Sequence, residues 1–499
     1  MAMLQEIDTL ILSAVVLTMD ENDRMLHDGG VAIHGGKIEA VDTSETLRRR
    51  YRAADVINAG GQVVMPGLVD TYGHAGHGLI RGLFHPAAGW PSGELYWHHT
   101  SEDWWYAEAL LAATERLRFG VTTGFSVIGA TPARVDSPAF TERNAEAYAR
   151  VGVRGVFGVG PPDILFSHLK EPWSGSFFEE GRWIERPFSY KDAVENSLEL
   201  IRVWHGAADG RIQVALAPPY LFGRHVAHGR QSHPLPTAED APLILKHAVE
   251  MSELARGHGV VLHTHMFKGS ISYALKHYGA DAVAELLGPE VVVAHANGLL
   301  EDEVEMLGAR GCSVATVAYT HENLWYGYAP VLELLHAGAN VTISTDGAAP
   351  YTSFDLLREL SRAIWNQWNQ YQDQLVLPPG RALRMITIDA ARALGLAEEV
   401  GSLEPGKRAD IITIDFRQPH LTPSSSVPHL LAHYASGHDV TTVLVDGEVL
   451  MRDKEVLSVD TDEVMQRARE EAQRALERID TARYTGLSKG FWRDARNGD

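Results

Sequence analysis

Eight short apolar runs, rich in β-branched residues, recur through the middle of the chain, and helical patterns lie between most of them. The runs occupy residues 67–74, 120–127, 152–159, 211–218, 259–266, 289–296, 311–318 and 340–347. Apolar strands that alternate with helices are typical of parallel strands buried on both faces. Eight is the number of such strands in a TIM barrel. We therefore predict an α/β fold with a (β/α)8 TIM barrel over residues 66–399.

A doubly wound open sheet is the alternative fold for this alternation of strands and helices. Such sheets often carry a glycine-rich phosphate loop after a strand, but no G-x-G-x-x-G or Walker-type sequence follows any of the eight runs. Several helical segments end in glycine, as helix C-caps do, for example the segment before Gly259. The barrel is therefore the favoured interpretation.

The two ends of the chain follow another pattern. Residues 1–65 alternate β-rich runs with turns, and residues 400–460 do the same, with a strand–turn–strand pattern at 445–450. We predict that these two segments form one small composite β-sandwich domain. Residues 461–499 contain a charged amphipathic helix and a tail, which we expect on the outside of the protein or at a subunit contact.

The formal charge is −21, from 65 acidic and 44 basic residues, and it argues against nucleic acid as a partner because phosphates would be repelled. No basic run indicates a membrane-surface helix, and no apolar stretch approaches the roughly 20 residues that span a bilayer. Cys312 is the only cysteine, so an intrachain disulfide and a thiolate metal cluster are both excluded. The start lacks the pattern of a signal peptide. We expect a cytoplasmic enzyme that acts on a small molecule.

Polar residues gather at the carboxyl ends of four predicted strands, which is where TIM barrels place their chemistry. These residues are Asp70, Tyr72 and His74 on the first strand, His263 and His265 on the fifth, His295 on the sixth and Asp346 on the eighth. Residues two apart on a strand share a face. Imidazoles and a carboxylate that converge on one rim suit a divalent cation such as zinc or iron.

Each of these residues also has a simpler interpretation. A single buried histidine is usually a hydrogen-bonded core residue, which is the interpretation we prefer for His263, one step deeper than His265. His77, His98 and His99 lie in predicted loops, where solvent exposure or a place in the pocket wall is more typical. Asp346 alone could cap the turn that follows it. The occurrence of such residues at four strand ends favours a site.

These segments together resemble the amidohydrolase superfamily, in the branch of cytosine-deaminase-like and chlorohydrolase-like enzymes. The resemblance covers about residues 7–475. It is carried by the sequences VVMPGLVDTYGH, SEDWWYAEALLAATERLRFGVTT, LHTH, AHANG, STDGA and GSLEPGKRADIITID, in that order. The resemblance implies a metal-bearing barrel with a composite β domain.

The chain departs from the family pattern at two positions. The first strand of the family carries His-x-His, whereas here Tyr72 replaces the first histidine and only His74 remains. The deaminating members usually have a glutamate three residues after the fifth-strand histidine, where this chain has Lys268. The fourth strand ends in ALAPPY, without the lysine that could bridge two metals, so the resemblance implies one metal ion.

The resemblance implies that His74, His265 and Asp346 hold one divalent ion, with zinc expected first and iron, manganese or cobalt as alternatives. His295, which in this branch lies beside the ligands, could move inward to restore the lost one. Tyr72 could instead bind the metal as a phenolate or donate a hydrogen bond to its water, and His77 is a third candidate. Otherwise Tyr72 and His77 would contact the substrate.

In such a site the metal lowers the pKa of its water from about 15.7 to roughly 7. Asp346 would accept the proton as the water attacks and then deliver it to the departing nitrogen. His295 would stabilise charge on the attacked centre. Lys268 would hold an anionic or carbonyl group of the substrate, or else face solvent.

The missing glutamate argues against ring deamination and favours attack on an amide, urea, carbamate or thiocarbamate carbon, as in phenylurea and thiocarbamate hydrolases. Two aromatic loops, residues 83–105 and 319–328, suit a flat apolar or aromatic substrate. The same loops could contact a partner subunit, and we expect a homo-oligomer, a dimer or larger.

Two alternatives remain open from the sequence. The first is an aminohydrolase that deaminates an aminated heterocycle, which ammonia release would reveal. The second is a metal-free degenerate barrel that acts as a binding or assembly protein. Tyr72 is the residue that supports this last interpretation, whereas the retention of His265, His295 and Asp346 speaks against it.

Overall fold

Eight parallel strands form the barrel that the sequence predicted. The structure is a computed structural model that describes residues 4–85, 88–128, 134–163, 165, 172–225, 235–323, 327–488 and 490–495, without the side chains of 321–323. The strands are β6 (Leu68–Asp70), β7 (Val121–Val127), β8 (Arg154–Val159), β11 (Ile212–Leu216), β12 (Leu262–Met266), β13 (Val291–His295), β14 (Ser313–Val317) and β15 (Asn340–Ser344). They are hydrogen-bonded in sequence order from β6 to β15. Nearly all their residues are buried, which explains the continuous apolar runs.

The barrel closes where β6 meets β15, and side chains supply much of that closure. The hydroxyl of Thr71 lies 2.7 Å from the hydroxyl of Thr342 and 2.6 Å from that of Ser344. One backbone hydrogen bond, from Asp346 N–H to the Tyr72 carbonyl at 3.0 Å, also joins the two strand ends. The closure therefore fixes the first strand end against the last.

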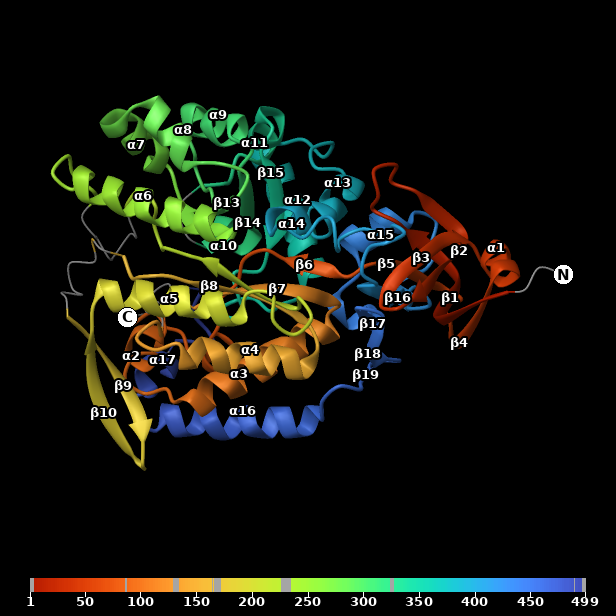
Figure 1. Cartoon of the computed structure of the whole chain (residues 1–499), viewed down its shortest axis with the longest axis horizontal. Coiled ribbons are helices and arrows are strands. Elements are labelled where there is room, and N and C mark those ends of the chain that lie inside the picture. Colours follow the sequence, from red (N-terminus) through yellow and green to blue (C-terminus); the bar gives the residue numbers. More distant parts are fainter. Residues whose placement is uncertain are drawn as a thin grey trace.

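Helices cover the outside of the barrel (Figure 1). They include α3 (Glu102–Arg118), α4 (Ala139–Val151), α5 (Tyr190–Trp204), α6 (Ala241–His258), α7 (Ser270–Tyr278), α8 (Ala280–Leu286), α9 (Glu301–Ala309), α11 (Val331–Ala337) and α12 (Leu356–Tyr371). Shorter helices are α2 (Ser92–Leu95), α10 (Ala318–Asn323), α13 (Pro379–Arg384), α14 (Ile388–Ala393) and α15 (Val427–His433). Helix α6 ends at Gly259 in the left-handed conformation, as its sequence predicted.

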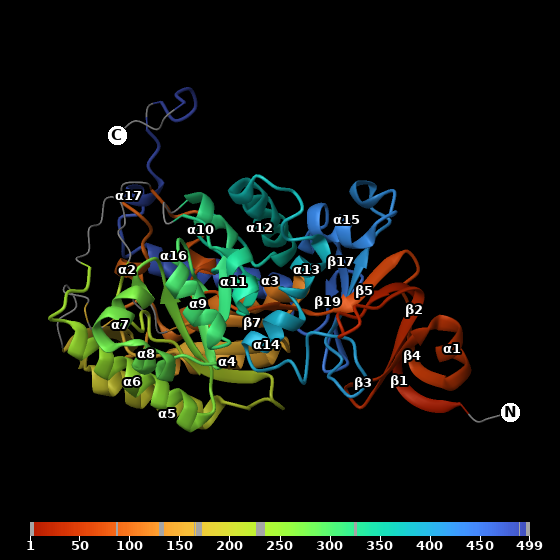
Figure 2. The same ribbon diagram turned by 90° about the horizontal axis from the view of Figure 1, so that it is seen from above.

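Strands from both ends of the chain join in one nine-stranded mixed sheet beside the barrel (Figures 1 and 2). The N-terminal strands are β1 (Gln5–Leu17), β2 (Met25–His34), β3 (Lys37–Thr43), β4 (Tyr51–Asn58) and β5 (Gln62–Pro66), with helix α1 (Ser44–Arg50) between them. The C-terminal strands are β16 (Ile411–Asp415), β17 (Val440–Val445), β18 (Glu448–Arg452) and β19 (Glu455–Val456). Antiparallel pairing of β5 with β16 connects the two ends. The predicted barrel with a composite β domain is thereby confirmed.

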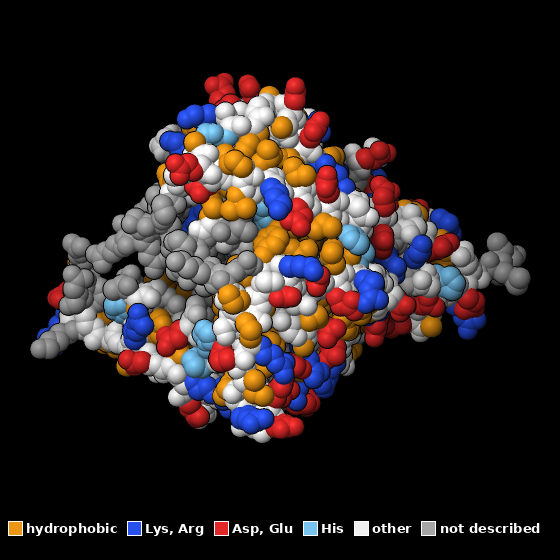
Figure 3. Space-filling model, turned by 60° about the vertical axis from the view of Figure 1, so that its left-hand side comes forward, with side chains coloured by type: hydrophobic (Ala, Val, Ile, Leu, Met, Phe, Trp, Pro, Cys, Tyr) orange, Lys and Arg blue, Asp and Glu red, His pale blue; other side chains and the backbone are white. Residues whose placement is uncertain are grey.

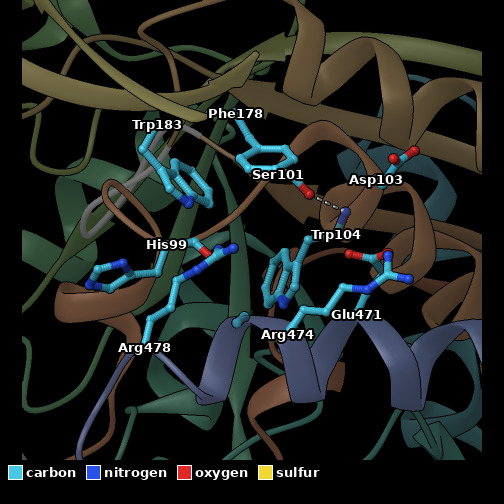
Figure 4. A pocket seen from close by; sticks show the side chains of 10 residues that line it. His99, Ser101, Asp103, Trp104, Phe178, Trp183, Glu471, Arg474 and Arg478 are labelled. Carbon is cyan, nitrogen blue, oxygen red and sulfur yellow. Dashed lines mark hydrogen bonds and ion pairs between the residues drawn. The ribbon is translucent and has the colours of Figure 1, made fainter. Parts of the chain in front are cut away.

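The C-terminal helix α16 (Thr461–Leu476) packs along α3 and is followed by the short α17 (Ala482–Thr485). A hairpin of β9 (Trp173–Glu179) and β10 (Arg182–Phe188), which the sequence analysis did not predict, follows the third barrel strand. Helices α3 and α16 and this hairpin enclose a cavity of about 210 Å³ with Trp183 and Arg478 in its wall (Figure 4). No lining residue of this cavity belongs to a barrel strand end.

None of the described helices combines the length and apolar character that crossing a bilayer requires.

Candidate active site

The site lies where β6, β12, β13 and β15 end. Tyr72 and His74 follow β6, His265 lies within β12, His295 ends β13, and Asp346 follows β15. Tyr72 is completely buried, and His295 and Asp346 are nearly so. The structure brings together side chains from the four strand ends at which the sequence placed them.

The hydroxyl of Tyr72 lies at the centre of these side chains. Its oxygen is 2.6 Å from Nε2 of His265 and 2.8 Å from Nε2 of His74. The Tyr72 ring stacks on His263, with 5.2 Å between centroids, and His263 in turn stacks on Phe125 at 4.4 Å. The stacked rings hold the phenol in line, so that its hydroxyl reaches the two imidazoles.

The direction of these hydrogen bonds follows from the neighbour of His265. Nδ1 of His265 lies 2.9 Å from the carbonyl oxygen of Pro219, which can only accept, so Nδ1 carries a proton. Burial and the nearby His295 hold the pKa of His265 well below its usual range, so the ring is neutral. Its Nε2 therefore accepts the proton of the Tyr72 hydroxyl. The Tyr72 oxygen is left to accept a hydrogen bond from His74.

Asp346 is hydrogen-bonded through both carboxylate oxygens. Oδ1 lies 3.2 Å from Nε2 of His74, and Oδ2 accepts from the hydroxyl of Tyr319 at 2.8 Å. Burial acts to raise the pKa of Asp346, but the hydrogen bond from His74 and the nearby imidazoles outweigh it and hold this pKa below its usual range. The carboxylate therefore stays ionised at neutral pH.

Two of the site residues have a backbone conformation that side chains other than glycine rarely adopt. His295 has φ 68° and Asp346 has φ 59°, both in the left-handed region. Such conformations cost about 1–3 kcal/mol each and are concentrated at functional sites. Here they occur at the two strand ends that carry the imidazole and the carboxylate.

His295 contributes an imidazole with an unused nitrogen. Its Nδ1 is buried and has no hydrogen-bond partner among the described residues. Its ring lies 5.3 Å from that of His265 and 5.2 Å from that of Phe267. Because burial lowers the pKa of His295, the ring is neutral and Nδ1 or Nε2 can accept a proton.

His77 lies inside the site rather than in solvent. Its ring packs 4.7 Å from the His74 ring and 4.7 Å from that of Trp90, and burial lowers the pKa of His77 well below its usual range. Gly347, with φ 96°, leaves the necessary space, because a Cβ there would come within 2.3 Å of His77 Nδ1. His77 is therefore packed into the site between His74 and Trp90.

The remaining sequence candidates are not hydrogen-bonded to the Tyr72 hydroxyl in the described residues. Lys268 is exposed at the end of β12, and its side chain makes no hydrogen bond or ion pair with a described residue. His263 is a core residue, as predicted, and burial lowers its pKa to about 3. His99 lines the separate cavity of Figure 4, near His98.

Asp70, which the sequence grouped with the site, holds the barrel together beneath it. Its carboxylate accepts hydrogen bonds from the backbone and hydroxyl of Thr345, at 3.1 and 2.7 Å. It also pairs with Arg116 at 3.3 Å, and both side chains are fully buried. A buried charge needs such a partner, so this pair belongs to the fold.

Sequence reasoning missed several members of the site. Tyr319 follows β14 directly, and its place at a strand end was the signal that could have identified it. Tyr220 follows β11 and lies with its ring 5.5 Å from His265. Asp163 follows β8, and burial raises its pKa to about 6. The predicted aromatic loops hold Trp90 and Tyr319, but residues 86–87 and 324–326 lie outside the described residues.

The residues present are not arranged to bind a metal ion, which differs from the prediction made from the sequence. Among the described residues, no group of three His, Cys, Asp or Glu side chains has the spacing to hold one. The point on which the His74 and His265 nitrogens converge is taken by the Tyr72 hydroxyl, and the lone pair of His265 Nε2 accepts its proton. His295 has not moved inward to make up the set His74, His265, His295 and Asp346.

Comparison with known proteins shows to which family the chain belongs. Residues 63–450 match the amidohydrolase family, and residues 29–54 match an imidazolonepropionase-like composite domain of bacteria. The chain belongs to the amidohydrolase family. It is accordingly an enzyme that hydrolyses carbon–nitrogen bonds other than peptide bonds, as the resemblance implied.

Two curated relatives match this amidohydrolase over nearly its whole length. A 5-methylthioadenosine/S-adenosylhomocysteine deaminase of Syntrophobacter fumaroxidans is 31% identical over 475 residues, 93% of this chain and 97% of the relative. A 5'-deoxyadenosine deaminase of Methanosarcina mazei is 32% identical over 486 residues, 95% of this chain and 100% of the relative.

Solved structures share the fold. An adenosine deaminase from Xanthomonas campestris with bound zinc has a TM-score of 0.77 at 22% identity, covering 95% of this chain and 99% of the other. An atrazine chlorohydrolase from Arthrobacter aurescens, complexed with zinc, has a TM-score of 0.72 at 21% identity, covering 93% and 100%. At this identity the likeness shows the barrel and composite domain.

Proposed function

We propose that this amidohydrolase removes an exocyclic amino group from a flat heterocycle by hydrolysis, with an adenine-type nucleoside as the first substrate class. The observation that carries the proposal is the similarity, over more than nine tenths of the chain, to enzymes named as deaminases of adenosine derivatives. From the sequence, this reaction was an alternative to amide or urea hydrolysis. The relatives favour the alternative.

The walls of the site suit a flat, apolar ligand. The rings of Tyr72, Trp90, Tyr220, Phe267 and Tyr319 surround the imidazoles, each bound to or packed against a site residue. Aromatic walls bind flat rings by stacking, and a few polar groups set the orientation. Figure 3 shows hydrophobic side chains gathered among charged ones on one face of the molecule.

The side chains present can move the protons that deamination requires. The oxygen of water bonds to the ring carbon, the carbon–nitrogen bond breaks, and the departing nitrogen leaves as ammonia. Neutral His295, with its unpaired Nδ1, takes the proton from water and returns it to the leaving nitrogen. Asp346, ionised and hydrogen-bonded to His74, stabilises the positive charge that His295 carries while it holds this proton.

Lys268 supports a second candidate, the hydrolysis of an amide, urea or carbamate. It occupies the position where the deaminating members of the family usually carry a glutamate, and its exposed ammonium is available for a carbonyl or anionic group. No proton at a ring nitrogen needs to be handled in that reaction. The two candidates share the barrel, the water attack and the C–N bond, and they differ in the group that leaves.

A divalent ion was predicted, and the two solved neighbours named above contain zinc. The Tyr72 hydroxyl occupies the point on which the His74 and His265 nitrogens converge, which does not support such an ion here. The proposal therefore assigns no step to a metal ion. The homo-oligomer and the domain boundaries at residues 65, 400 and 460 stay predictions.

Product analysis with the purified full chain tests the proposal. 5'-Deoxyadenosine, 5'-methylthioadenosine, an aminotriazine, a phenylurea and an anilide would each be incubated, and ammonia and the organic product would be identified by mass spectrometry. Exchange of an amino group for oxygen in the nucleosides or the triazine is the expected result. Cleavage of the urea or anilide alone would favour the second candidate, and loss of turnover in Asp346→Asn would assign either reaction to this site.

A further inference from the structure

We infer that the Tyr72 hydroxyl takes the place between His74, His265 and Asp346 that a divalent cation would need, so that this site works without a bound metal. The inference concerns the same site as the proposed function, but it does not depend on which substrate is cleaved.

Side-chain length explains how one substitution has this effect. A histidine at position 72 would end at its ring nitrogen, and an ion would lie about 2 Å beyond it. A tyrosine is longer by about that same metal–nitrogen distance, so its oxygen reaches the point that the histidine would leave for the ion. The observed contacts of 2.6 and 2.8 Å with two imidazole nitrogens place the oxygen at this point.

Ligation by the tyrosine itself, which the sequence left open, has a different geometry. Two ligand atoms that share a tetrahedral zinc at 2.0–2.1 Å lie about 3.3 Å apart. The Tyr72 oxygen is closer than this to both nitrogens, at distances normal for hydrogen bonds. The atoms are therefore arranged as a hydrogen-bonded centre rather than as a coordination sphere.

The surroundings keep the hydroxyl in position. The phenol ring is fully buried and stacks on His263, which is clamped by Phe125. The Nδ1 donor of His265 is tied to the Pro219 carbonyl, so the ring cannot turn its nitrogen away without losing this bond. Admitting an ion would require Tyr72 to leave a packed core position, at the cost of both hydrogen bonds.

The inferred role for Tyr72 is a positioning one. Its hydroxyl donates to His265 and accepts from His74, and His74 lies 3.2 Å from Asp346, so one oxygen links three of the four predicted ligands. The network keeps the imidazoles and the carboxylate beside His295 in the arrangement that an ion would otherwise impose.

Metal analysis by mass spectrometry, on protein produced with added zinc, manganese, iron or cobalt salts and then dialysed, tests the inference first by metal content, a readout that needs no substrate. The parent is expected to hold far less than one ion per chain, and its turnover is expected to survive incubation with a chelator. About one tightly held ion per chain in the parent, or loss of turnover on chelation, would overturn the inference.

Tyr72→His supplies the second arm, because it shortens the side chain and restores a nitrogen ligand. It is expected to gain about one zinc per chain and a zinc-dependent rise in its thermal unfolding midpoint. Tyr319→Phe is the matched control, since it removes a hydroxyl from Asp346 and leaves the imidazoles unaltered; it should gain no zinc. A folded Tyr72→His protein that binds no zinc would also overturn the inference. If Tyr72→His does not fold, the measurements on the parent decide. Because these are metal contents, the inference and the proposed substrate class can fail separately.

Discussion

The hydroxyl of Tyr72 donates a hydrogen bond of 2.6 Å to Nε2 of His265, across 193 positions of sequence and from the first barrel strand to the fifth. His265 cannot turn elsewhere, because its other nitrogen donates to the carbonyl of Pro219. Nε2 of His265 therefore accepts, and the Tyr72 hydroxyl is the donor that it has in the site. Removal of this hydrogen bond should therefore lower the free energy of unfolding by a measurable amount.

Tyr72→Phe keeps the ring stacked on His263 but leaves His265 Nε2 buried without a donor. We expect the free energy of unfolding to fall by about 1–3 kcal/mol, since an unpaired buried polar group carries that cost. Urea denaturation followed by fluorescence or circular dichroism measures it. Tyr106→Phe, whose hydroxyl lies near the surface and bonds only Arg150 at 3.4 Å, is the control and should change little. Equal stability of the two variants would contradict the assigned hydrogen bond.

Gly347→Ala should displace His77 from the site. The added Cβ would lie 2.3 Å from His77 Nδ1, at a φ of 96° that alanine adopts with strain. We expect turnover to fall by at least tenfold and the free energy of unfolding to fall by about 1–3 kcal/mol. Gly181→Ala, in the β9–β10 turn at φ 78° with open space around its Cβ, reports the backbone strain alone.

The double variant Gly347→Ala/His77→Ala separates the contact from the strain. If the clash with His77 dominates, removing the imidazole should restore part of the lost stability. The effects of the two substitutions would then not be additive, as is typical of neighbouring positions. Stability losses that simply add would show that His77 does not rest against Gly347.

The barrel and its strand ends could be predicted because burial on both faces leaves continuous apolar runs, and eight of these alternate with helical patterns between residues 67 and 347. The β9–β10 hairpin was missed although Gly181 marks its turn, since β10 is mostly exposed and its sequence RWIERPF contains no continuous apolar run. Asp70 was grouped with Tyr72 and His74 as the predicted end of the first strand, and the two-residue period of a strand was used to pair Tyr72 with His74. That period ends with β6 at Asp70 itself, so the residues beyond it follow the loop instead.

The role of Tyr72 could not be predicted from its position alone. A phenol at that point can ligate a metal, form a hydrogen bond with a water molecule or replace the ion. Only interatomic distances distinguish these three roles, and a sequence does not contain them. The decisive facts are the lengths of the side chains and the tautomer of His265, which is fixed by a carbonyl 46 residues away.

Glu108 should make stability depend on pH. It is completely buried on α3 and accepts a hydrogen bond from Gly78 N–H at 3.3 Å, under the loop that carries His74 and His77. Burial raises the pKa of Glu108 from 4.5 to about 7. Because the folded state holds this proton more tightly than the unfolded chain, the stabilisation is complete below pH 4.5 and is lost as the pH rises through 7. The loss amounts to roughly 3 kcal/mol.

Glu108→Gln removes the titrating group and keeps an acceptor for Gly78. Its free energy of unfolding should vary less between pH 5 and pH 8 than that of the parent, and it should exceed the parent's at pH 8. Urea denaturation across this range measures both. A slope as steep as the parent's would show that Glu108 does not titrate there.

Asp346→Asn should lower turnover by about a hundredfold or more, since acid–base and charge stabilisation of this kind contribute 10²–10⁴-fold. The amide keeps the size of the side chain and an acceptor for Tyr319, but it removes the charge opposite His74 and His295. Steady-state kinetics on the identified substrate measures the effect. Asp302→Asn, whose carboxylate bonds Ser272 outside the barrel mouth, is the control and should retain turnover. Undiminished activity of Asp346→Asn would remove this carboxylate from the mechanism.

Lys268→Ala distinguishes the two candidate reactions. Lys268 is exposed just after β12 and makes no hydrogen bond or ion pair with a described residue, so its loss should not alter folding. If the substrate is an amide, urea or carbamate held by this charge, KM should rise about tenfold, equivalent to about 1.4 kcal/mol of binding. If it is an aminated heterocycle held by aromatic walls, KM should change less than twofold. Lys276→Ala, an exposed lysine on α7, controls for the loss of one positive charge. A fall in kcat at constant KM would fit neither binding role and would place Lys268 in the chemical step instead.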